Sequence, residues 1–202
     1  MPDGWEVISL GEIAYIQNGF AFKSKDYVEN GIPMIRTKDI NSEGFINNSE
    51  LISLPLSFYN EVKYEDFKFK CFDTVLVMVG ASIGKIGIIT DINLPSLQNQ
   101  NMWRFRTKSN LISPAFVYFY VEKINEIVYS WATGSARSFY RKNMFSDAEC
   151  ILPSEEYLIT FNNLVMPMLE KINKNATEIE YLTTMRGILL PKLMSGEIDS
   201  RR

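Results

Sequence analysis

The segment from Gly80 to Lys85, which reads Gly-Ala-Ser-Ile-Gly-Lys, holds residue types that could bind a phosphate group. Backbone N–H groups in a tight glycine loop, with Ser82 and Lys85 beside them, can donate hydrogen bonds to phosphate oxygens. A nucleotide-binding P-loop has four residues between its glycines and a Ser or Thr after its lysine. Here three residues separate the glycines, Ile86 follows Lys85, and the next segment is typical of a strand. The spacing therefore disfavours a nucleotide site and favours a contact with a DNA phosphate or base edge.

Further segments combine cationic side chains with amide or aromatic ones. Asn and Gln amides match the major-groove edge of adenine, and Lys and Arg bind phosphate. Each segment alone is a weak signal, because charged loops are usually only solvated and Asn and Gln in loops usually form turns. Taken together with the glycine loop, they predict DNA contacts through the following side chains: Lys23, Lys25, Arg36, Lys38, Ser82, Lys85, Gln98, Asn99, Gln100, Arg104, Ser135, Arg137, Tyr140, Arg141 and Lys142.

The distribution of charge leaves room for a nucleic-acid partner, although the net charge of −3 argues against one. Residues 1–67 carry five Lys or Arg and eleven Asp or Glu, a balance of −6. Residues 68–142 carry ten Lys or Arg and four Asp or Glu, a balance of +6. If the fold gathers these cations on one face, that face can bind phosphate.

The sequence contains no histidine, which removes the commonest general base and the commonest metal ligand. It also excludes a Ser-His or Cys-His nucleophile within this chain, whereas carboxylate or lysine chemistry stays open. Cys71 and Cys150 lack the spacing of a metal site. No apolar run approaches the length of a membrane span and no export signal is visible, so we expect a cytoplasmic chain with two ordinary thiols and neither a membrane nor a metal as partner.

The elements that must position these loops make up an α+β domain, mixed and mostly β, over residues 1–153. Ser9 and Glu12 have the spacing of a capping box and predict a short helix through Ile16. Pro33 cannot donate to a central ladder, which predicts an edge strand over residues 31–36. The other expected elements are strands over 5–10, 72–79, 85–90, 102–106 and 148–152, a helix over 55–64 and a helix that begins at Pro114.

Residues 154–202 are expected to form a helical region that pairs with a second chain. Eleven positions at alternating steps of three and four, from Leu158 to Leu193, include nine apolar residues, which is typical of a coiled-coil seam. Pro167 predicts a break, with a short helix over 154–165 and a long one from 167 to about 190. The alternative is a helix packed on its own domain. The predicted dimer or partner interface is Met168, Ile172, Asn175, Ile179, Leu182, Arg186 and Leu189.

Several motifs, in this order along the whole chain, resemble those of the DNA specificity (S) subunits of type I restriction–modification systems. The resemblance implies a target-recognition domain that reads one half of a split double-stranded DNA site. It also implies long helices that hold two such domains apart as an antiparallel pair. The motifs are Gly4 to Glu12, Gly19 to Ser24, Gly31 to Arg36, Gly80 to Lys85, Asn99 to Asn101, Gly134 to Ala136 and Leu190 to Ile198.

The resemblance also implies partners and a division of labour. Methyltransferase (M) subunits would dock on the helices and bring S-adenosylmethionine, a motor-nuclease (R) subunit could join, and this chain would hold no cofactor and no catalytic residue. The usual S subunit carries two recognition domains, whereas this sequence has one, so we expect either a half-subunit that forms a homodimer on an inverted repeat or a fragment. Two rival hypotheses are an assembly protein that no longer reads DNA and a nucleotide-using enzyme built on Gly80 to Lys85.

Overall fold

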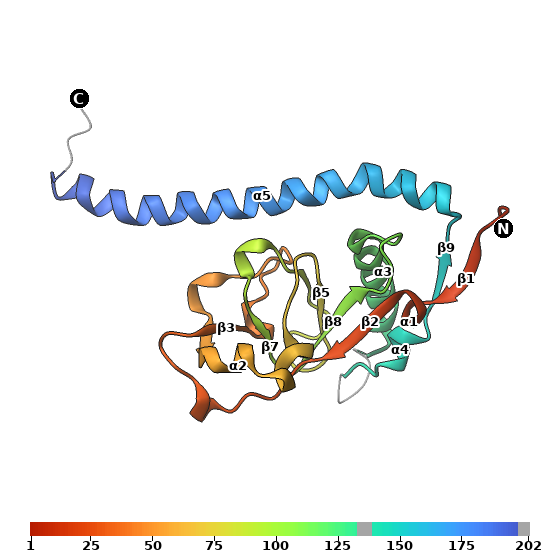
Figure 1. Cartoon of the computed structure of the whole chain (residues 1–202), viewed down its shortest axis with the longest axis horizontal. Helices are drawn as coiled ribbons and strands as arrows, with labels where there is room; N and C mark the ends of the chain where they lie inside the picture. Colours follow the sequence, from red (N-terminus) through yellow and green to blue (C-terminus); the bar gives the residue numbers. More distant parts are fainter. Residues whose placement is uncertain (133–138, 198–202) are drawn as a thin grey trace.

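The computed structural model describes residues 1–132 and 139–197. Figure 1 shows one long helix, α5 (Glu155–Met194), that lies across the described part of residues 1–153, which we call the head. The strands and longer helices of the head are β1 (Glu6–Ser9), α1 (Leu10–Ile13), β2 (Ala14–Asn18), β3 (Ile32–Ile35), β4 (Ile52–Leu54), α2 (Leu56–Asn60), β5 (Thr74–Val77), β6 (Ile86–Ile88), β7 (Leu97–Gln98), β8 (Met102–Thr107), α3 (Pro114–Ala132), α4 (Asn143–Ser146) and β9 (Glu149–Leu152). Short 3₁₀ helices include η4 (Val62–Phe67) and η5 (Asp91–Asn93).

The strands of the head form three sheets. The four-stranded sheet has the order β2-β8-β5-β6 and is antiparallel throughout. The three-stranded sheet has the order β4-β3-β7, in which β3 and β7 run parallel, and β1 pairs with β9 as a separate antiparallel ribbon. The predicted mixed α+β domain followed by a long C-terminal helix is therefore confirmed.

The main core lies between the four-stranded sheet and α3. Trp103 and Phe105 of β8 point into it, and the ring of Phe145 from α4 lies 5.5 Å and 5.9 Å from theirs between centroids. Because side chains alternate along a strand, Arg104 and Arg106 point to the opposite face of β8. There both guanidinium groups lie near Asp73 of the neighbouring segment.

The capping box at the start of α1 is present, but the helix is shorter than predicted. The backbone N–H of Ser9 donates to Oε2 of Glu12 at 2.6 Å. The helix stops at Ile13, and the next five residues form β2 instead of a further helical turn up to Ile16. Buried Ala14 and Ile16 alternate with exposed Tyr15, a period of two that suits pairing with β8.

Two other predicted elements are also corrected. β3 is the central strand of its sheet and not an edge strand. Pro33 is tolerated there because the ladder with β7 begins only at Met34, so Pro33 stands before it. The helix expected over residues 55–64 is divided into α2 and η4, which meet at Glu61, where the backbone is extended.

The helix α5 is continuous through Pro167, which corrects the predicted break. It also continues through Pro191 and ends at Met194, four residues beyond the expected end. An internal proline removes one backbone hydrogen bond and crowds the preceding turn. Apolar contacts with the head hold the helix on both sides of Pro167, because Leu158 and Leu169 are both buried there. Packing on the head thus outweighs the local preference of proline for a break.

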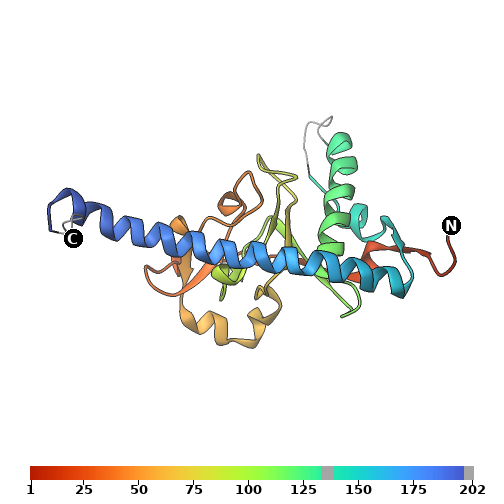
Figure 2. The same cartoon turned by 90° about the horizontal axis from the view of Figure 1, so that it is seen from above.

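The first half of α5 packs on its own head, and the C-terminal end of the helix projects past the head (Figure 2). The amide nitrogen of Asn162 donates to the carbonyl oxygen of Leu111 at 2.7 Å, and Asn173 bonds to Asp91 of η5. The packing alternative raised by the sequence therefore holds for the start of the predicted seam, including Leu158. The later seam residues, from Met168 onward, stay largely exposed. Among the described residues, no helix is long and apolar enough to cross a bilayer.

Candidate nucleic-acid interface

Loops predicted to bind DNA lie at one edge of the four-stranded sheet of the head. β2 and β5 end at this edge, at Asn18 and Val77, whereas β6 and β8 begin there, at Ile86 and Met102. Antiparallel pairing brings the start of one strand to the end of its neighbour. The loops that follow Asn18 and Val77 and the turn before Met102 therefore lie together, although they are far apart in the sequence.

Backbone hydrogen bonds join the turn over residues 98–101 to two of these segments. The N–H of Phe20 donates to the carbonyl of Gln98 at 3.2 Å, and the N–H of Gln100 donates back to Phe20 at 2.9 Å. The N–H of Asn99 donates to the carbonyl of Ile35, the residue before Arg36, at 3.1 Å. The start of the 20–25 segment and the end of β3 thus meet at this turn.

Gly19 is required for this close approach. A Cβ atom at this position would lie 1.7 Å from the carbonyl oxygen of Asn99, where no side chain fits. Asn101 closes the same turn with a φ of 70°, a left-handed conformation that Asn adopts more readily than most residues. The sequence motifs around Gly19 and Asn101 are therefore two sides of one backbone junction.

The glycine loop and residues 139–142 join the turn from the other side. The N–H of Met78 donates to the carbonyl of Asn101 at 3.1 Å, and the N–H of Tyr140 donates to the carbonyl of Met78 at 2.9 Å. Val79 and Phe139 form a single antiparallel bridge. All the predicted segments, as far as the structure describes them, are thus linked in one row by main-chain contacts.

Exposed side chains along this row can reach an external ligand. The lysine, arginine and glutamine members can donate to phosphate or base edges. Phe20 and Phe139 are 36% and 48% exposed, and the guanidinium of Arg141 lies over the Phe139 ring at 5.8 Å. Exposed rings of this kind can stack on bases. The exposed predicted residues are Lys23, Lys25, Lys38, Gln100, Arg141 and Lys142, and Ser82 and Asn99 are partly exposed.

The glycine loop is held from behind and does not form a nucleotide site. The amide nitrogen of Asn125 on α3 donates to the carbonyl of Gly84 at 2.9 Å. The Nζ of Lys85 donates to the carbonyl of Ile40 at 3.0 Å, so in this conformation it turns towards the head. β6 follows the loop, as predicted, so no helix N-terminus faces the place where a phosphate would sit.

Three residues predicted to bind DNA are corrected, because they are buried. The amide nitrogen of Gln98 donates to the carbonyls of Gln17 and Met102. The guanidinium of Arg104 donates to two carbonyls of the 66–68 segment at 2.9 Å and 2.8 Å. The hydroxyl of Tyr140 donates to Asn125, and burial raises its pKa to about 12. These side chains support the loops from inside and have no free surface for DNA.

Arg36 is held within the head as well. Its guanidinium donates to both carboxylate oxygens of Asp39, at 3.0 Å and 2.9 Å, and to the carbonyl of Glu50 at 2.8 Å. A bidentate pair of this geometry fixes the side chain. Arg36 therefore shapes the segment that carries exposed Lys38. Ser135 and Arg137 lie outside the described residues.

Sequence reasoning missed the ionic cluster around Asp73. Arg106 forms two hydrogen bonds with this buried carboxylate, at 2.7 Å and 2.5 Å, and Nε of Arg104 lies 3.9 Å from it. Burial lowers the pKa of Arg104 to about 10, although Asp73 acts in the opposite direction. Arg104 therefore stays charged at neutral pH, and both arginines donate to the carbonyl of Lys68. The alternation along β8 was the signal that could have revealed this structural role.

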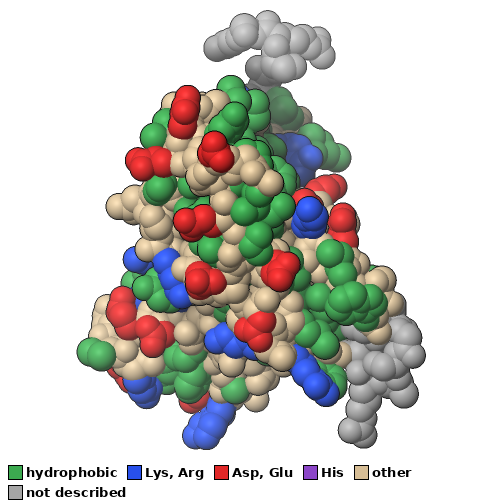
Figure 3. All heavy atoms as spheres, turned by 90° about the vertical axis from the view of Figure 1, so that its right-hand side faces the viewer, with side chains coloured by type: hydrophobic (Ala, Val, Ile, Leu, Met, Phe, Trp, Pro, Cys, Tyr) green, Lys and Arg blue, Asp and Glu red, His purple; other side chains and the backbone are tan. Residues whose placement is uncertain are grey.

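Charge is unevenly spread over the end of the molecule that carries β1 and β9. Figure 3 shows that Asp and Glu side chains lie mostly over its upper and middle parts, nearer to α5. Lys and Arg side chains are more frequent towards the lower edge, on the side away from α5. Lys and Arg side chains on the side away from α5 can attract a polyanion. The described residues contain no group of three or more Cys, Asp or Glu side chains that could hold a metal ion.

Comparisons with known proteins identify the relatives of this chain. Residues 2–180 match the model of the type I restriction modification DNA specificity domain. The MjaIX specificity subunit of Methanocaldococcus jannaschii is 28% identical over 98% of this chain and 45% of its own length. The HindI specificity subunit of Haemophilus influenzae is 27% identical over 98% of this chain and 42% of its own. The chain thus spans less than half the length of these relatives.

Solved structures share the fold. The S subunit from M. genitalium covers 95% of this chain with a TM-score of 0.63 and 17% identity, and the match takes up 46% of that subunit. The HsdS subunit from Thermoanaerobacter tengcongensis covers 98% with a TM-score of 0.54 and 16% identity. Since the family match extends over most of the sequence, the chain belongs to the family of type I restriction–modification DNA specificity subunits.

Proposed function

We propose that this chain reads one half of a split DNA target and docks the methyltransferase subunits of a type I restriction–modification complex, without doing chemistry itself. The observation that carries the proposal is the row of loops at one edge of the four-stranded sheet. Five segments from distant parts of the sequence meet there through main-chain hydrogen bonds. Such a row presents a fixed set of side chains, as sequence reading requires.

Within this row, the side chains divide the task of binding. Lys23, Lys25, Arg141 and Lys142 would bind phosphates and fix the position of the head on the duplex. The amide of Gln100, exposed at the tip of the 98–101 turn, has the donor and acceptor pair that matches adenine. Ser135 and Arg137 remain proposed contacts.

Membership of the family supports the rest of the proposed complex. A second copy would pair through α5 and bring a second head, so the target would be an inverted repeat with a fixed gap. The methyltransferase subunits would supply S-adenosylmethionine and catalysis, and a motor-nuclease subunit could join them. The exposed apolar residues of α5 support a further protein contact there.

The test compares specific and random DNA with the complex assembled on methyltransferase subunits. The specific target is the sequence that becomes methylated in cells carrying these subunits. Gln100→Ala should lower affinity for this target by about 1–3 kcal/mol and leave random duplex unchanged. Arg141→Ala or Lys142→Ala should weaken binding to both and reduce the salt slope by about 1. Lys174→Ala, an exposed cation on α5, is the matched control.

Equal affinity of the native chain for target and random duplex, with methyltransferase binding intact, would refute half-site reading. That result would favour the assembly protein that no longer reads DNA. If Lys174→Ala weakens DNA binding as much as Arg141→Ala does, the cations that bind DNA are not located in the row of loops at the sheet edge.

A further inference from the structure

Eight residues of α5 form one exposed stripe along the flank of the helix. Successive residues of a helix are turned by about 100°, so positions separated by steps of three and four stay on one side. Six of the eight are apolar, and Ile179 and Leu182 are 64% and 56% exposed. The two polar members, Asn175 and Arg186, are exposed as well. The stripe consists of Met168, Ile172, Asn175, Ile179, Leu182, Arg186, Leu189 and Leu193.

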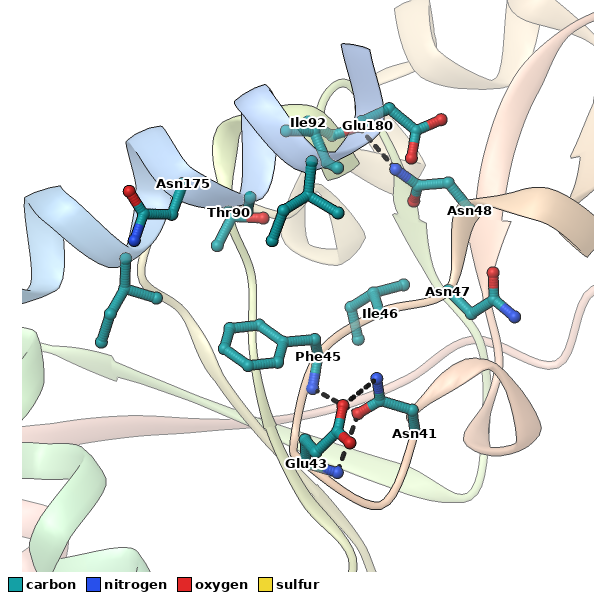
Figure 4. Close-up of a pocket in the computed structure, with 13 residues that line it drawn as sticks. Asn41, Glu43, Phe45, Ile46, Asn47, Asn48, Thr90, Ile92, Asn175 and Glu180 are labelled. Atoms are coloured by element: carbon teal, nitrogen blue, oxygen red, sulfur yellow. Dashed lines mark hydrogen bonds between the residues drawn. The ribbon is translucent and has the colours of Figure 1, made fainter. Parts of the chain in front are cut away.

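The head completes a groove along the first half of this stripe. One cavity of about 450 Å³ lies between Asn175 and its neighbours on α5 and the segment around Phe45 and Ile46 (Figure 4). A second cavity of about 380 Å³ lies between Met168 and Ile172 on the helix and Phe119 on α3. An elongated apolar element that lies on the stripe would therefore also meet these walls of the head.

The stripe is itself elongated and apolar. A second copy of α5 is therefore the occupant that fits the stripe and its groove. In a parallel pair, each stripe residue faces its own copy, so Arg186 would face Arg186 of the partner at close range. In an antiparallel pair, the C-terminal half of one stripe, from Leu182 to Leu193, lies on the N-terminal half of the other, from Met168 to Ile179. The apolar residues of the C-terminal half can then enter the groove beside the N-terminal half of the other stripe.

The polar residues select one alignment among the antiparallel ones. In that alignment Asn175 faces the partner's Arg186, and every other layer is apolar on both sides. A shift of one heptad in one direction places the partner's Arg186 against Met168. It also sends the partner's Leu189 towards Val165, which the head already covers in part. A shift in the other direction places the partner's Arg186 against Leu182 and leaves Met168 and Ile172 uncovered.

We propose that two copies of this chain pair antiparallel with Asn175 of each opposite Arg186 of the other. This rests on the dimer of the proposed function and assigns its register. The two-fold axis passes between Glu180 and Tyr181, and the other layers join Ile179 to the partner's Leu182, Ile172 to its Leu189 and Met168 to its Leu193. The partner's Leu190 then falls beside Leu169, at the second cavity. Ion pairs on the flank do not select this register, because Lys171 lies near the partner's Lys192.

A charge exchange in the polar layer tests the register. Asn175→Lys faces the partner's Arg186 in two symmetric layers, so the dimer should dissociate at about tenfold higher concentration or more. Arg186→Glu alone places a carboxylate opposite an amide and should change dissociation little. The double variant Asn175→Lys/Arg186→Glu should recover the dimer, because each layer then joins opposite charges. Analytical ultracentrifugation measures all three, and failure of the double variant to recover would overturn the register.

Disulfide trapping gives a second, independent readout. In a Cys71→Ser background, Asn175→Cys/Arg186→Cys should form a covalent dimer under mild oxidation. Asn175→Cys/Ile179→Cys should form one only if the register is shifted by a heptad. A covalent dimer from the second pair and not from the first would overturn the assigned register while the dimer itself stands. A native chain that stays monomeric over the whole concentration range, alone and with methyltransferase subunits, would instead refute the dimer of the proposed function.

Discussion

Asn173 of α5 and Asp91 of η5 are joined by two hydrogen bonds that run in opposite directions. The backbone N–H of Asp91 donates to Oδ1 of Asn173 at 2.8 Å, and Nδ2 of Asn173 donates to the carboxylate of Asp91 at 2.6 Å. The pair lies 82 residues apart in the sequence and fixes the helix to the head beyond its last buried apolar contact, Leu169. The direction in which α5 leaves the head therefore depends on this pair.

Replacement of Asn173 by Ala should remove both hydrogen bonds at once. We expect the free energy of unfolding to fall by about 1 kcal/mol, because the groups are partly solvated and water replaces part of the loss. Urea denaturation followed by circular dichroism measures the change. Lys174→Ala, at the neighbouring exposed position, is the control and should be nearly neutral; equal losses in both variants would contradict the role of the pair.

The same pair should make the attachment of α5 sensitive to acid. The hydrogen bond from Asn173, followed by one from Cys71, lowers the pKa of Asp91 below its ordinary value of 3.8. A carboxyl group whose pKa is lower in the folded state stabilises the fold above its ordinary pKa, and this stabilisation is lost as the pH falls through the folded pKa. The difference in stability between the native chain and Asn173→Ala should therefore be constant above about pH 5 and shrink below pH 4. If the difference in stability instead grows on acidification, Asp91 does not have this role.

Gly19→Ala should disrupt the junction at the candidate DNA interface. The added Cβ would collide with the carbonyl of Asn99, which is backbone and cannot move aside like a side chain. We expect a loss of about 2 kcal/mol or more in stability, together with weaker DNA binding. Gly187→Ala on α5 meets nothing within 4 Å and should instead stabilise the chain by about 0.5–1 kcal/mol. Unchanged stability in Gly19→Ala would mean that residue 19 does not contact the carbonyl of Asn99 in solution.

Pro167→Ala distinguishes a continuous helix from a broken one. If α5 is continuous, the change restores a backbone hydrogen bond and relieves crowding, and stability should rise by about 1–2 kcal/mol. If the helix breaks at Pro167 in solution, alanine adds no hydrogen bond to the folded state. It only raises the conformational entropy of the unfolded chain, so stability should fall. Denaturation midpoints decide between these outcomes.

Ile179→Asp or Leu182→Asp should convert the proposed dimer to monomers. A carboxylate at either position would be buried without a partner in the paired helices, which is costly. Light scattering measures the mass in solution. Thr184→Asp is the matched control, because Thr184 is exposed on the side of the helix away from the stripe. A dimer that survives Ile179→Asp would place the contact elsewhere.

Local patterns predicted most elements because local physics decides them. The alternation over residues 102–106 and the Ser-Pro start of α3 each mark an element whose type depends on its own residues. The seam residues from Met168 onward are exposed on one face, as a stripe that repeats every 3.5 residues must be. The meeting of the loop segments follows from the order of strands, which the sequence did not predict.

The failures have one cause, which is contact with distant parts of the chain. Gln98 and Arg104 have the polarity of surface residues, but carbonyl groups brought in by other segments satisfy them inside the head. Pro167 would end an isolated helix, yet contacts with the head at Leu158 and Leu169 carry the helix past it. Pro33 fits a central strand because the neighbouring β7 is only two residues long. In each case the deciding partner is remote in sequence.

The pairing of β1 with β9 has a consequence for how such chains can be built. Glu6 lies opposite Leu152, so the first and last strands of the head meet at a single corner, directly before α5 begins. Domains whose ends adjoin tolerate insertion into other chains, because the junction leaves the interior undisturbed. Exchange of the head at this corner should therefore replace the loops proposed to bind DNA and leave α5 unchanged.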